Sequence, residues 1–368
     1  MFGTTTDPVR KAMELLPLGP VVLIDTAGFD DVGELGLQRV GKTNRVMQQV
    51  DVAVIVADAG DGELSCELEL IQKLVQRKVP CIAVFNKSDL AQPFVPDKLK
   101  ELQGDCGEEL LRILTVSALT GAGINELKEC LAELGKQCER TQRLVADLLE
   151  EGDHVILVVP IDESAPKGRL ILPQQQTIRD ILDAGAFCSV VKPSGLRALL
   201  DGMKEFPRLV ITDSQAFGEV SRMVPQEIPL TSFSILMARY KGNLYPSVNG
   251  ANVLDDIHGG DRILISEGCT HHRQCGDIGT VKLPNLIRKY SGCEPVFSFS
   301  SGNDFPEDVS GYRLVIHCGA CTLNEKEMQR RAGICQTQGV PMTNFGIAIA
   351  KMNGILERSI APLRMDER

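Results

Sequence analysis

The chain contains no tryptophan and only four tyrosines among its 368 residues. Proteins that hold single-stranded nucleic acids stack bases on aromatic side chains, so this scarcity argues against such a platform. The formal net charge of −10 leaves no basic excess for a phosphate backbone. No apolar run approaches the length of a membrane span, and the first residues show no signal-peptide pattern. We therefore expect a soluble, cytoplasmic protein whose partners are neither nucleic acid nor membrane.

Two further patterns are missing. There is no Cys-x₃-Cys-x₂-Cys run of the kind that radical-SAM enzymes carry, and no internal repeat or low-complexity segment is evident. The chain does contain 12 cysteines. In a cytosolic protein we expect them to be reduced, and most to be small buried side chains such as Cys81.

What is present indicates an α/β protein. Residues 20–145 alternate short apolar strands with helical stretches, which predicts a doubly wound parallel sheet. Within this alternation, residues 21–24 are predicted to be a buried strand and residues 108–113 a helix. A charged helical connector is predicted at 136–151.

Two smaller α/β units are predicted beyond the connector. The first has strands at 154–160, 186–191 and 209–212, and its default role is scaffolding or dimerisation. Residues 235–255 contain two glycines and a proline and are interpreted as the passage into the last unit. The predicted domains are thus 1–140, 150–235 and 240–368.

One set of motifs suits the phosphate end of a guanine nucleotide. Asp25 ends a strand, where its carboxylate can hold a Mg²⁺-bound water, and Gly28 exposes its N–H to a γ-phosphate. Thr4 and Thr5 stand in a Gly-Thr-Thr-x-Asp segment at residues 3–7. These segments resemble the third and second motifs of small GTPases, the latter in its TrmE-like form.

A second set suits the base. Asn86 and Lys87 follow a strand, and Asp89 can accept both N–H groups of the guanine edge. Ser117 and Ala118 end the next strand and are placed to close over the base. They resemble the fourth and fifth GTPase motifs, and four motifs in order predict a GTPase domain that binds GTP and Mg²⁺.

The phosphate-binding loop is the exception to this pattern. Residues 36–43 fit Gly-x₄-Gly-Lys-Ser/Thr to the letter. A working loop follows a buried strand and opens a helix, whereas this segment lies between the third and fourth motifs, where GTPases carry a switch helix. We interpret it as a chance match, and expect the true loop to have preceded residue 1. GTP hydrolysis by this chain is therefore expected to be weak or absent.

The cysteines with the most informative spacing lie near the carboxyl end. Cys269-x-His271 follows one predicted strand, and His317-Cys318-x-x-Cys321 follows another. If both strands belong to one parallel sheet, both segments leave from its carboxyl edge, where such sheets place their ligands. The donor set suits an iron–sulfur cluster or a structural zinc ion, and a coincidental pattern without metal remains possible.

The arrangement of domains resembles the [FeFe]-hydrogenase maturation GTPases (HydF) over nearly the whole chain. The resemblance implies a regulatory GTPase domain, a middle domain that makes a homodimer, and a last domain that binds a [4Fe–4S] cluster. It implies that Cys269, Cys318 and Cys321 hold the cluster and that His271 or His317 is the fourth ligand or contacts the cargo. It further implies a carrier that receives a di-iron precursor made with two radical-SAM maturases and delivers it to apo-[FeFe]-hydrogenase.

Two other classes fit parts of the sequence. One is a zinc-stapled GTPase acting in RNA modification or ribosome assembly, against which the acidic charge counts. The other is an iron–sulfur enzyme with its own substrate, against which the lack of a clear acid–base pair in the last unit counts. Iron and sulfide analysis of the anaerobically purified protein distinguishes these classes.

Overall fold

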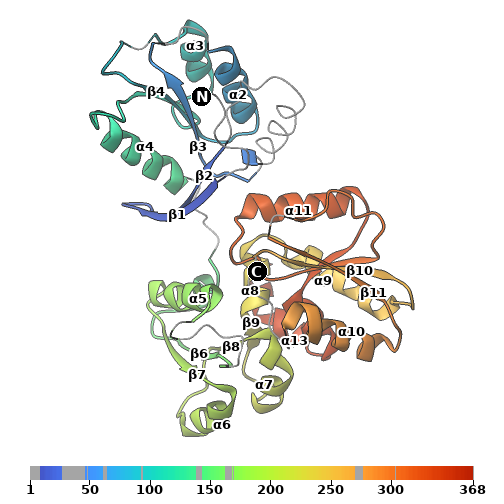
Figure 1. The fold of residues 1–368 in the computed structure, drawn as a ribbon. Helices are drawn as coiled ribbons and strands as arrows, with labels where there is room; N and C mark the ends of the chain where they lie inside the picture. Colours follow the sequence, from blue (N-terminus) through green and yellow to red (C-terminus); the bar gives the residue numbers. More distant parts are fainter. Residues whose placement is uncertain are drawn as a thin grey trace. The chain divides into compact units, whose positions relative to one another are not determined.

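The computed structural model describes residues 9–26, 46–47, 49–60, 64–92, 94–137, 143–161, 168, 170–269, 277–302 and 304–367. The chain forms two compact units, Met1–Thr141 and Gln142–Arg368 (Figure 1). Both are built from strands and helices in alternation, as predicted for an α/β protein.

The first unit contains a parallel sheet of order β3-β4-β5. The described elements of this unit are β1 (Val9–Leu15), β2 (Gly19–Asp25), β3 (Ala53–Asp58), α2 (Ser65–Gln76), β4 (Cys81–Asn86), α3 (Asp97–Cys106), β5 (Leu111–Thr115) and α4 (Ile124–Gln137). The central strand β4 is almost entirely buried because its run of Cys, Ile, Ala, Val and Phe packs on both faces. Cys81 is buried there, as predicted.

The strand predicted at residues 21–24 exists, but it is not buried. It belongs to β2, which pairs with β1 as an antiparallel hairpin and is not hydrogen-bonded to the parallel sheet among the described strands. Val22 and Leu23 are 57% and 48% exposed. An apolar run indicates a strand, but burial depends on neighbouring elements that the run itself does not specify.

Two other local predictions are wrong. Residues 108–113 were predicted to be helical, but Leu111 begins the strand β5, which pairs with β4. Pairing and the complete burial of Leu111 outweigh the helix preference of the preceding glutamates. The connector at 136–151 is not one helix either, because the described residues 143–151 contain only the short 3₁₀ turn Ala146–Leu148.

The second unit holds two four-stranded parallel sheets, of orders β7-β6-β8-β9 and β11-β10-β12-β13. Helix α9 (Leu244–Ala251) lies between the two sets of elements in the chain and packs against the second sheet. The elements around the first sheet are β6 (His154–Val158), α5 (Leu172–Asp183), β7 (Phe187–Val191), α6 (Pro193–Gly202), β8 (Leu209–Thr212), α7 (Phe217–Met223), β9 (Leu230–Ser232) and α8 (Phe233–Tyr240). Those around the second are β10 (Arg262–Glu267), α10 (Leu283–Ser291), β11 (Val296–Ser301), β12 (Leu314–His317), α11 (Glu325–Thr337), β13 (Met342–Asn344), α12 (Phe345–Met352) and α13 (Leu356–Ile360). Figure 1 shows the first set in green to yellow and the second in orange to red.

The predicted passage at residues 235–255 is largely helical. It contains most of α8 and all of α9, and several of its apolar side chains are fully buried. Gly242 has a φ of +69° and separates the two helices, so the glycine marked a helix end and not a linker.

The second unit also contains an internal repeat, contrary to the sequence-based expectation. The two sheets have the same strand order, and their registers agree residue by residue. Thus Val155 pairs with Leu209 in one sheet, as Ile263 pairs with Leu314 in the other. We call residues 152–242 the first repeat and residues 260–354 the second repeat.

Identical residues recur at equivalent positions of the two repeats. The segment Arg-Leu-Val-Ile occurs at 208–211 and again at 313–316, and the segment from Thr231 through Gly242 corresponds to that from Thr343 through Gly354. Both glycines have a φ near +70°, namely +69° and +70°. Both threonines are fully buried, and neither hydroxyl has a hydrogen-bond partner in the described part of the chain. Dispersed identities of this kind become visible once the registers fix the alignment.

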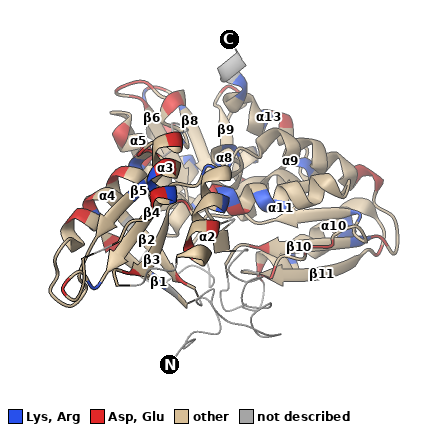
Figure 2. Ribbon diagram, turned by 90° about the horizontal axis from the view of Figure 1, so that it is seen from above, with Lys and Arg blue, Asp and Glu red and all other residues tan. Residues whose placement is uncertain are grey.

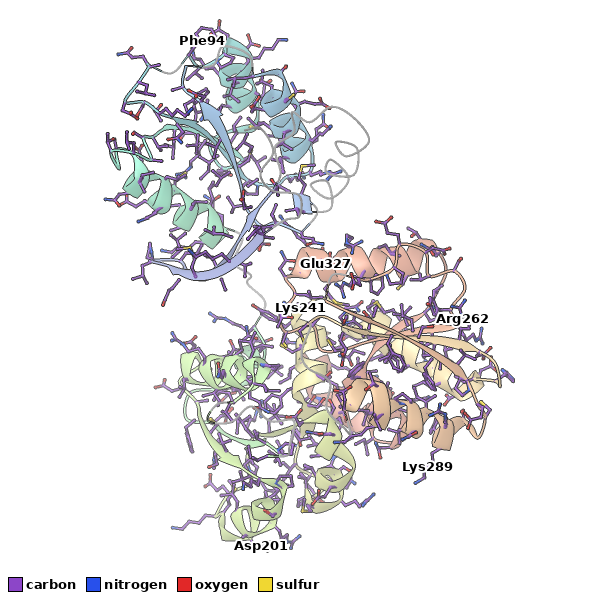
Figure 3. All side chains as sticks on the ribbon, in the orientation of Figure 1. Phe94, Asp201, Lys241, Arg262, Lys289 and Glu327 are labelled. Carbon is purple, nitrogen blue, oxygen red and sulfur yellow. The ribbon has the colours of Figure 1, made fainter. Side chains whose placement is uncertain are left out.

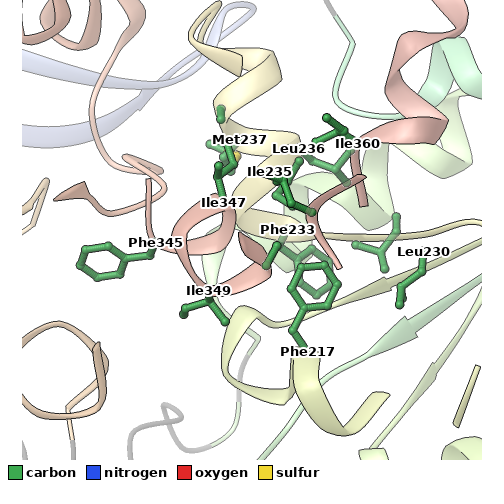
Figure 4. Packing of buried hydrophobic residues seen from close by; sticks show 14 of the residues in the cluster. Phe217, Leu230, Phe233, Ile235, Leu236, Met237, Phe345, Ile347, Ile349 and Ile360 are labelled. Carbon is green, nitrogen blue, oxygen red and sulfur yellow. The ribbon is translucent and has the colours of Figure 1, made fainter. Parts of the chain in front are cut away.

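The repeats share one hydrophobic core, in which α8 packs against α12 (Figure 4). The N-termini of α8 and α12 approach each other closely, since a Cβ added to Gly346 would lie 2.7 Å from Cβ of Ser234. Ser234 is also a hydrogen-bond partner there, because its hydroxyl accepts the Gly346 N–H at 3.2 Å and its carbonyl accepts from Asn344. The two repeats are therefore fastened together at the start of their last helices.

Charged residues of both signs lie close together along helices such as α3 and α11 (Figure 2). Within the described residues, no helix is both long enough and apolar enough to cross a bilayer.

Candidate nucleotide and thiol sites

The predicted guanine-binding residues meet at the carboxyl ends of β4 and β5. The Ala118 N–H donates to Oδ1 of Asn86 at 3.0 Å, and the Ser117 hydroxyl donates to Oδ1 of Asp89 at 2.5 Å. The loop is tight, because a Cβ on Gly123 would lie 2.4 Å from the carbonyl oxygen of Thr115. The Asp89 carboxylate is thus held in place by the residue that follows the neighbouring strand.

Asp58, which was not among the predicted guanine-binding residues, also lies at the carboxyl edge of this sheet. Asp58 ends β3 beside Asn86, and its carboxylate binds Nζ of Lys87 at 2.6 Å and the Gly60 N–H at 3.0 Å. The hydrogen bond from Lys87 lowers the pKa of Asp58, and Asp58 raises the pKa of Lys87. Lys87 has a φ of +64°, an uncommon value for a residue with a side chain, and the contact with Asp58 helps to hold it there. The rule that strand ends carry ligands would have identified Asp58.

Of the residues predicted to bind the phosphates, Asp25 is the one that lies in the described part of the chain. Asp25 is exposed at the end of β2, in a sheet separate from the one that carries Asn86 and Ser117. Thr4, Thr5 and Gly28 lie outside the described residues, as does the segment 36–43.

The Asp89→Asn substitution is expected to weaken binding of GTP by roughly one to two powers of ten, because a charge-assisted acceptor is lost. It is also expected to admit xanthine nucleotides, since the amide offers a donor where the carboxylate accepted. Competition binding with GTP and XTP measures both effects. Asp97→Asn, an exposed change on α3, serves as the control. Unchanged guanine preference in the Asp89 variant would contradict the assignment.

The three cysteines of the predicted cluster site leave neighbouring parallel strands. Cys318 directly follows β12, and Cys269 lies two residues beyond the end of β10. The strands are paired through Ser266 and His317, so both segments emerge at one carboxyl edge, as predicted. Cys321 lies in the same loop as Cys318.

This loop is shaped to present a sulfur atom to N–H donors. The Gly268 N–H lies 3.1 Å from Sγ of Cys318, and the Ala320 N–H lies 3.4 Å from the same atom. The Thr322 hydroxyl donates to the Gly268 carbonyl at 3.2 Å, which links the two cysteine segments. Ala320 has a φ of +53°, an uncommon value for a residue with a side chain. Strain of this kind is typical of functional loops.

Burial disfavours the charged form of these three thiols. Burial raises the pKa of Cys269 and of Cys318 to about 11, and it also raises the pKa of Cys321. The three cysteines are also close enough for charge on one to raise the pKa of another. Cys321 raises the pKa of Cys269, Cys269 raises that of Cys318, and Cys318 raises that of Cys321. A ligand that binds thiolates must therefore displace protons and supply positive charge.

The geometry bears on which metal centre fits. Within the described residues, no group of three or more His, Cys, Asp or Glu side chains converges to hold one metal ion. Thiolates on a zinc ion all bind one atom, whereas thiolates on a cubane bind different irons and stand further apart. Three neighbouring thiols, with two N–H groups directed at one sulfur, offer donors that either kind of centre uses. His271 lies outside the described residues, as does Cys275.

His317, predicted as a fourth ligand or a contact of the cargo, has a well-defined environment. It is fully buried, and both ring nitrogens are engaged: Nδ1 lies 2.9 Å from the Cys318 carbonyl oxygen and Nε2 lies 2.9 Å from the Arg331 guanidinium. Arg331 can only donate, so Nε2 accepts and Nδ1 carries the proton that the carbonyl accepts. Burial, with the Arg331 charge, lowers the pKa of His317 to about 4, so the ring is neutral. This geometry makes His317 a support of the loop that carries Cys318 and Cys321, which we call the cysteine loop. Neither ring nitrogen is then free to bind a metal.

Arg331 extends this support into a buried ion-pair network. Its Nε donates to Oε1 of Glu327 at 2.7 Å, and it also bonds the Gly302 carbonyl at 2.5 Å. Glu327 binds Arg330 at 2.7 Å as well. Burial raises the pKa of Glu327, but hydrogen bonds from both arginines outweigh it, so the pKa lies below its ordinary value. The pattern of Glu and Arg at four-residue spacing was visible in the sequence but gave no sign of burial.

The helix α8 of the first repeat supplies further contacts to the cysteine loop. Nζ of Lys241, at the end of α8, donates to the Leu323 carbonyl at 2.5 Å (Figure 3). Ser234 lies against Gly319, with its Oγ 3.7 Å from where a Cβ would stand. Sequence reasoning missed both residues, because neither is near the cysteines along the chain.

Three parts of the chain match known domain families. Residues 144–242 match the hydrogen maturase F dimerization domain, and residues 245–362 match the hydrogen maturase F tetramerization domain. Residues 21–137 match the GTP-binding domain of elongation factor Tu. The sequence analysis predicted a dimer, and the tetramerization match adds a second kind of association.

Curated relatives resemble mainly the first unit. The tRNA modification GTPase MnmE of Heliobacterium modesticaldum is 31% identical over 135 residues, which cover 36% of this chain and 27% of that protein. The MnmE of Nitratidesulfovibrio vulgaris strain DP4 is 30% identical over 206 residues, covering 50% of this chain and 44% of that protein. The chain therefore spans less than half the length of these relatives.

The two hydrogen maturase F matches together cover more than half of the chain and contain both repeats. A GTP-binding domain with MnmE-like relatives precedes them, in the order that the sequence motifs predicted. The chain belongs to the hydrogen maturase F family.

Proposed function

We propose that this protein is a scaffold and carrier in [FeFe]-hydrogenase maturation. In this proposal it holds a [4Fe–4S] cluster on Cys269, Cys318 and Cys321 and delivers a di-iron precursor to apo-hydrogenase. The observation that carries the proposal is the meeting of these three thiols at one sheet edge, in a chain of this family.

The protein's own groups would act as follows. The three thiols lose their protons and bind as thiolates, while the Gly268 and Ala320 N–H groups stabilise the negative charge on Cys318. Three thiolates would hold the cluster and leave it able to accept a further ligand, which is the chemistry that a carrier requires. His317 fixes the loop through the Cys318 carbonyl. The fourth-ligand role, predicted for His271 or His317, is therefore proposed for His271 alone.

The first unit would act as a guanine-nucleotide switch. Its base-reading edge is formed by Asn86, Asp89 and Ser117, and GTP with Mg²⁺ would bias the contacts made with partners. In this scheme the protein forms a homodimer, and GTP hydrolysis is regulatory. Its other partners are the apo-[FeFe]-hydrogenase and the two radical-SAM maturases.

A zinc-stapled GTPase acting in RNA modification is the alternative, favoured by the MnmE-like relatives of the first unit. The net charge of −10 argues against an RNA partner. Metal analysis separates the two proposals, because one expects iron and sulfide and the other stoichiometric zinc.

A transfer assay tests the carrier function directly. The cluster-loaded protein is incubated with a di-iron precursor, freed of excess, and mixed with apo-hydrogenase. Hydrogen evolution is expected from the loaded protein and not from protein that was never exposed to the precursor. Activation by free precursor alone, at the same rate, would contradict a carrier role.

A further inference from the structure

The two edges of each sheet in the second unit differ in length and in exposure. Among the described strands, β7 and β11 form one edge of their sheets, and β9 and β13 form the other (Figure 1). The strands β9 and β13 are three residues long, and every residue in them is buried. The strands β7 and β11 have five and six residues and contain exposed apolar side chains. Each repeat therefore has one short, covered edge and one longer edge that reaches the surface.

The exposed side chains of β7 and β11 occupy equivalent positions in the two repeats. The registers with β6 and β10 make Phe187 equivalent to Val296, and Val190 equivalent to Phe299. Phe187 and Val296 are each 51% exposed, and Val190 and Phe299 are 44% and 41% exposed. Side chains three residues apart in a strand point to opposite faces of its sheet. Each of these edges thus presents apolar surface on both faces, although the residues at the two positions differ between the repeats.

The sequence of β11 does not contain the residues that usually keep an edge strand from pairing. It reads Val-Phe-Ser-Phe-Ser-Ser, without a charged residue or a proline. The Val296 N–H donates to the Asp261 carbonyl, on the side of β10, at 2.8 Å. Because the peptide groups of a strand alternate in direction, the N–H and C=O of Phe297 point away from β10, toward the outer edge. An uncharged edge of this length is suited to bind another strand, and natural proteins normally protect or cover such an edge.

A second copy of this chain is the partner that fits the β11 edge. This strand lies within the residues that match the hydrogen maturase F tetramerization domain. Two copies of one strand related by a two-fold axis run antiparallel, so their residues face each other across the axis. An uncharged strand tolerates this pairing, because it brings no like charges together. Arg288, whose guanidinium lies 5.1 Å from the centroid of the Phe297 ring, is itself paired with Glu294 at 2.8 Å.

We propose that β11 pairs with β11 of a second copy in antiparallel orientation, and that this contact joins dimers into a tetramer. The four-stranded sheet of one copy then continues into that of the other. The contact uses the second repeat, so the first repeat, which matches the dimerization domain, remains available for the dimer. Because the same surface is used on both copies, the contact closes on itself and assembly stops at a defined number of chains. The inference concerns association and does not depend on a cluster.

The experiment measures the size of the assembly by sedimentation velocity over a range of protein concentrations. It compares the wild-type chain with a double variant that carries Val296→Lys and Phe299→Lys. Both side chains are exposed in the single chain, so the variant is expected to fold. In the contact, however, apolar burial is lost and each added ammonium group must be desolvated. The dissociation constant of the tetramer is expected to rise by roughly two powers of ten or more, which leaves dimers.

Tyr245→Lys is the matched control for the double variant. Tyr245 is 48% exposed, but it lies on α9, which packs against β13 at the opposite edge of the same sheet. The control is expected to assemble like wild type, because its added charge lies away from β11.

Amide hydrogen exchange of the wild-type chain locates the contact without any substitution. The β11 amides, such as that of Phe297, are expected to exchange about tenfold more slowly when tetramers predominate than after dilution to dimers. The amides of β13 are covered within one chain and are expected to exchange equally in both states.

Each outcome decides the proposal. Tetramers that persist in the double variant overturn it, as does an equal loss of tetramers in Tyr245→Lys. A wild-type chain that never exceeds a dimer also overturns it. If the double variant fails to fold, the exchange experiment still decides, because unchanged β11 exchange on assembly excludes this contact. Neither measurement involves iron or a di-iron precursor, so failure here leaves the proposed carrier function unaffected.

Discussion

Replacing Cys318 with alanine is expected to abolish cluster binding, reducing iron from about four atoms per chain to none. The Cys318 sulfur follows β12 directly and accepts two N–H groups, so the backbone fixes its position in the site. The same loss is expected for Cys269→Ala and Cys321→Ala. Anaerobic reconstitution, followed by iron and sulfide analysis and by absorbance near roughly 400 nm, measures the effect. The variants are also expected to give no hydrogenase activation.

Three controls separate ligand loss from misfolding. Cys318→Ser keeps an acceptor for the two N–H groups but removes the thiolate, so it should fold and still lack iron. Cys66 is exposed on α2 and Cys335 is buried in α11, and alanine at either position should leave iron binding unchanged. A colourless protein with stoichiometric zinc would overturn the cluster, and full activation by the Cys318 variant would reduce the cluster to a structural role.

The Glu327→Gln substitution is expected to lower the free energy of unfolding of the second unit by about 3–5 kcal/mol. The change leaves Arg331 fully buried without its carboxylate partner, and Arg331 in turn holds His317 beneath the cysteine loop. Figure 3 marks Glu327 on α11. Because the pKa of Glu327 is lowered, its contribution is present above its unfolded pKa and is lost as the pH falls through the folded value. Urea denaturation at neutral and acidic pH measures both effects.

The matched control is another carboxylate–arginine pair at four-residue spacing on a helix. Asp183 binds Arg179 at 2.8 Å on α5, but their side chains are 39% and 77% exposed. Asp183→Asn is therefore expected to change stability by less than about 1 kcal/mol. Similar losses for the two variants would show that burial does not strengthen the Glu327 network.

Local sequence patterns were sufficient to predict those strands that are continuous apolar runs. The strand that became β8 was predicted at its observed position, and strands were correctly predicted before the Cys269 and Cys318 segments, because burial on both faces leaves a clear signal. The meeting of Cys269 with Cys318 followed from this, since parallel strands end at one edge. The same reasoning placed Ser117 beside Asp89.

Predictions failed where the structure of a segment depended on the helices and strands that pack against it. Residues 21–24 form a strand in an exposed hairpin, and Leu111 joins a strand instead of a helix because β4 lies beside it. Helices α8 and α9 occupy a segment whose glycines suggested a linker. In each case tertiary packing outweighed a weak local preference.

The sequence by itself determined the α/β class, the order of the GTPase and cysteine motifs, and the strand ends from which those motifs leave, because these depend on residues close together in the chain. Only the tertiary structure revealed the repeat, the engagement of both His317 nitrogens, and the reach of Lys241 across 82 residues to Leu323. Those features arise because two similar sheets bury their last helices against each other, and such packing brings together residues that no local pattern connects.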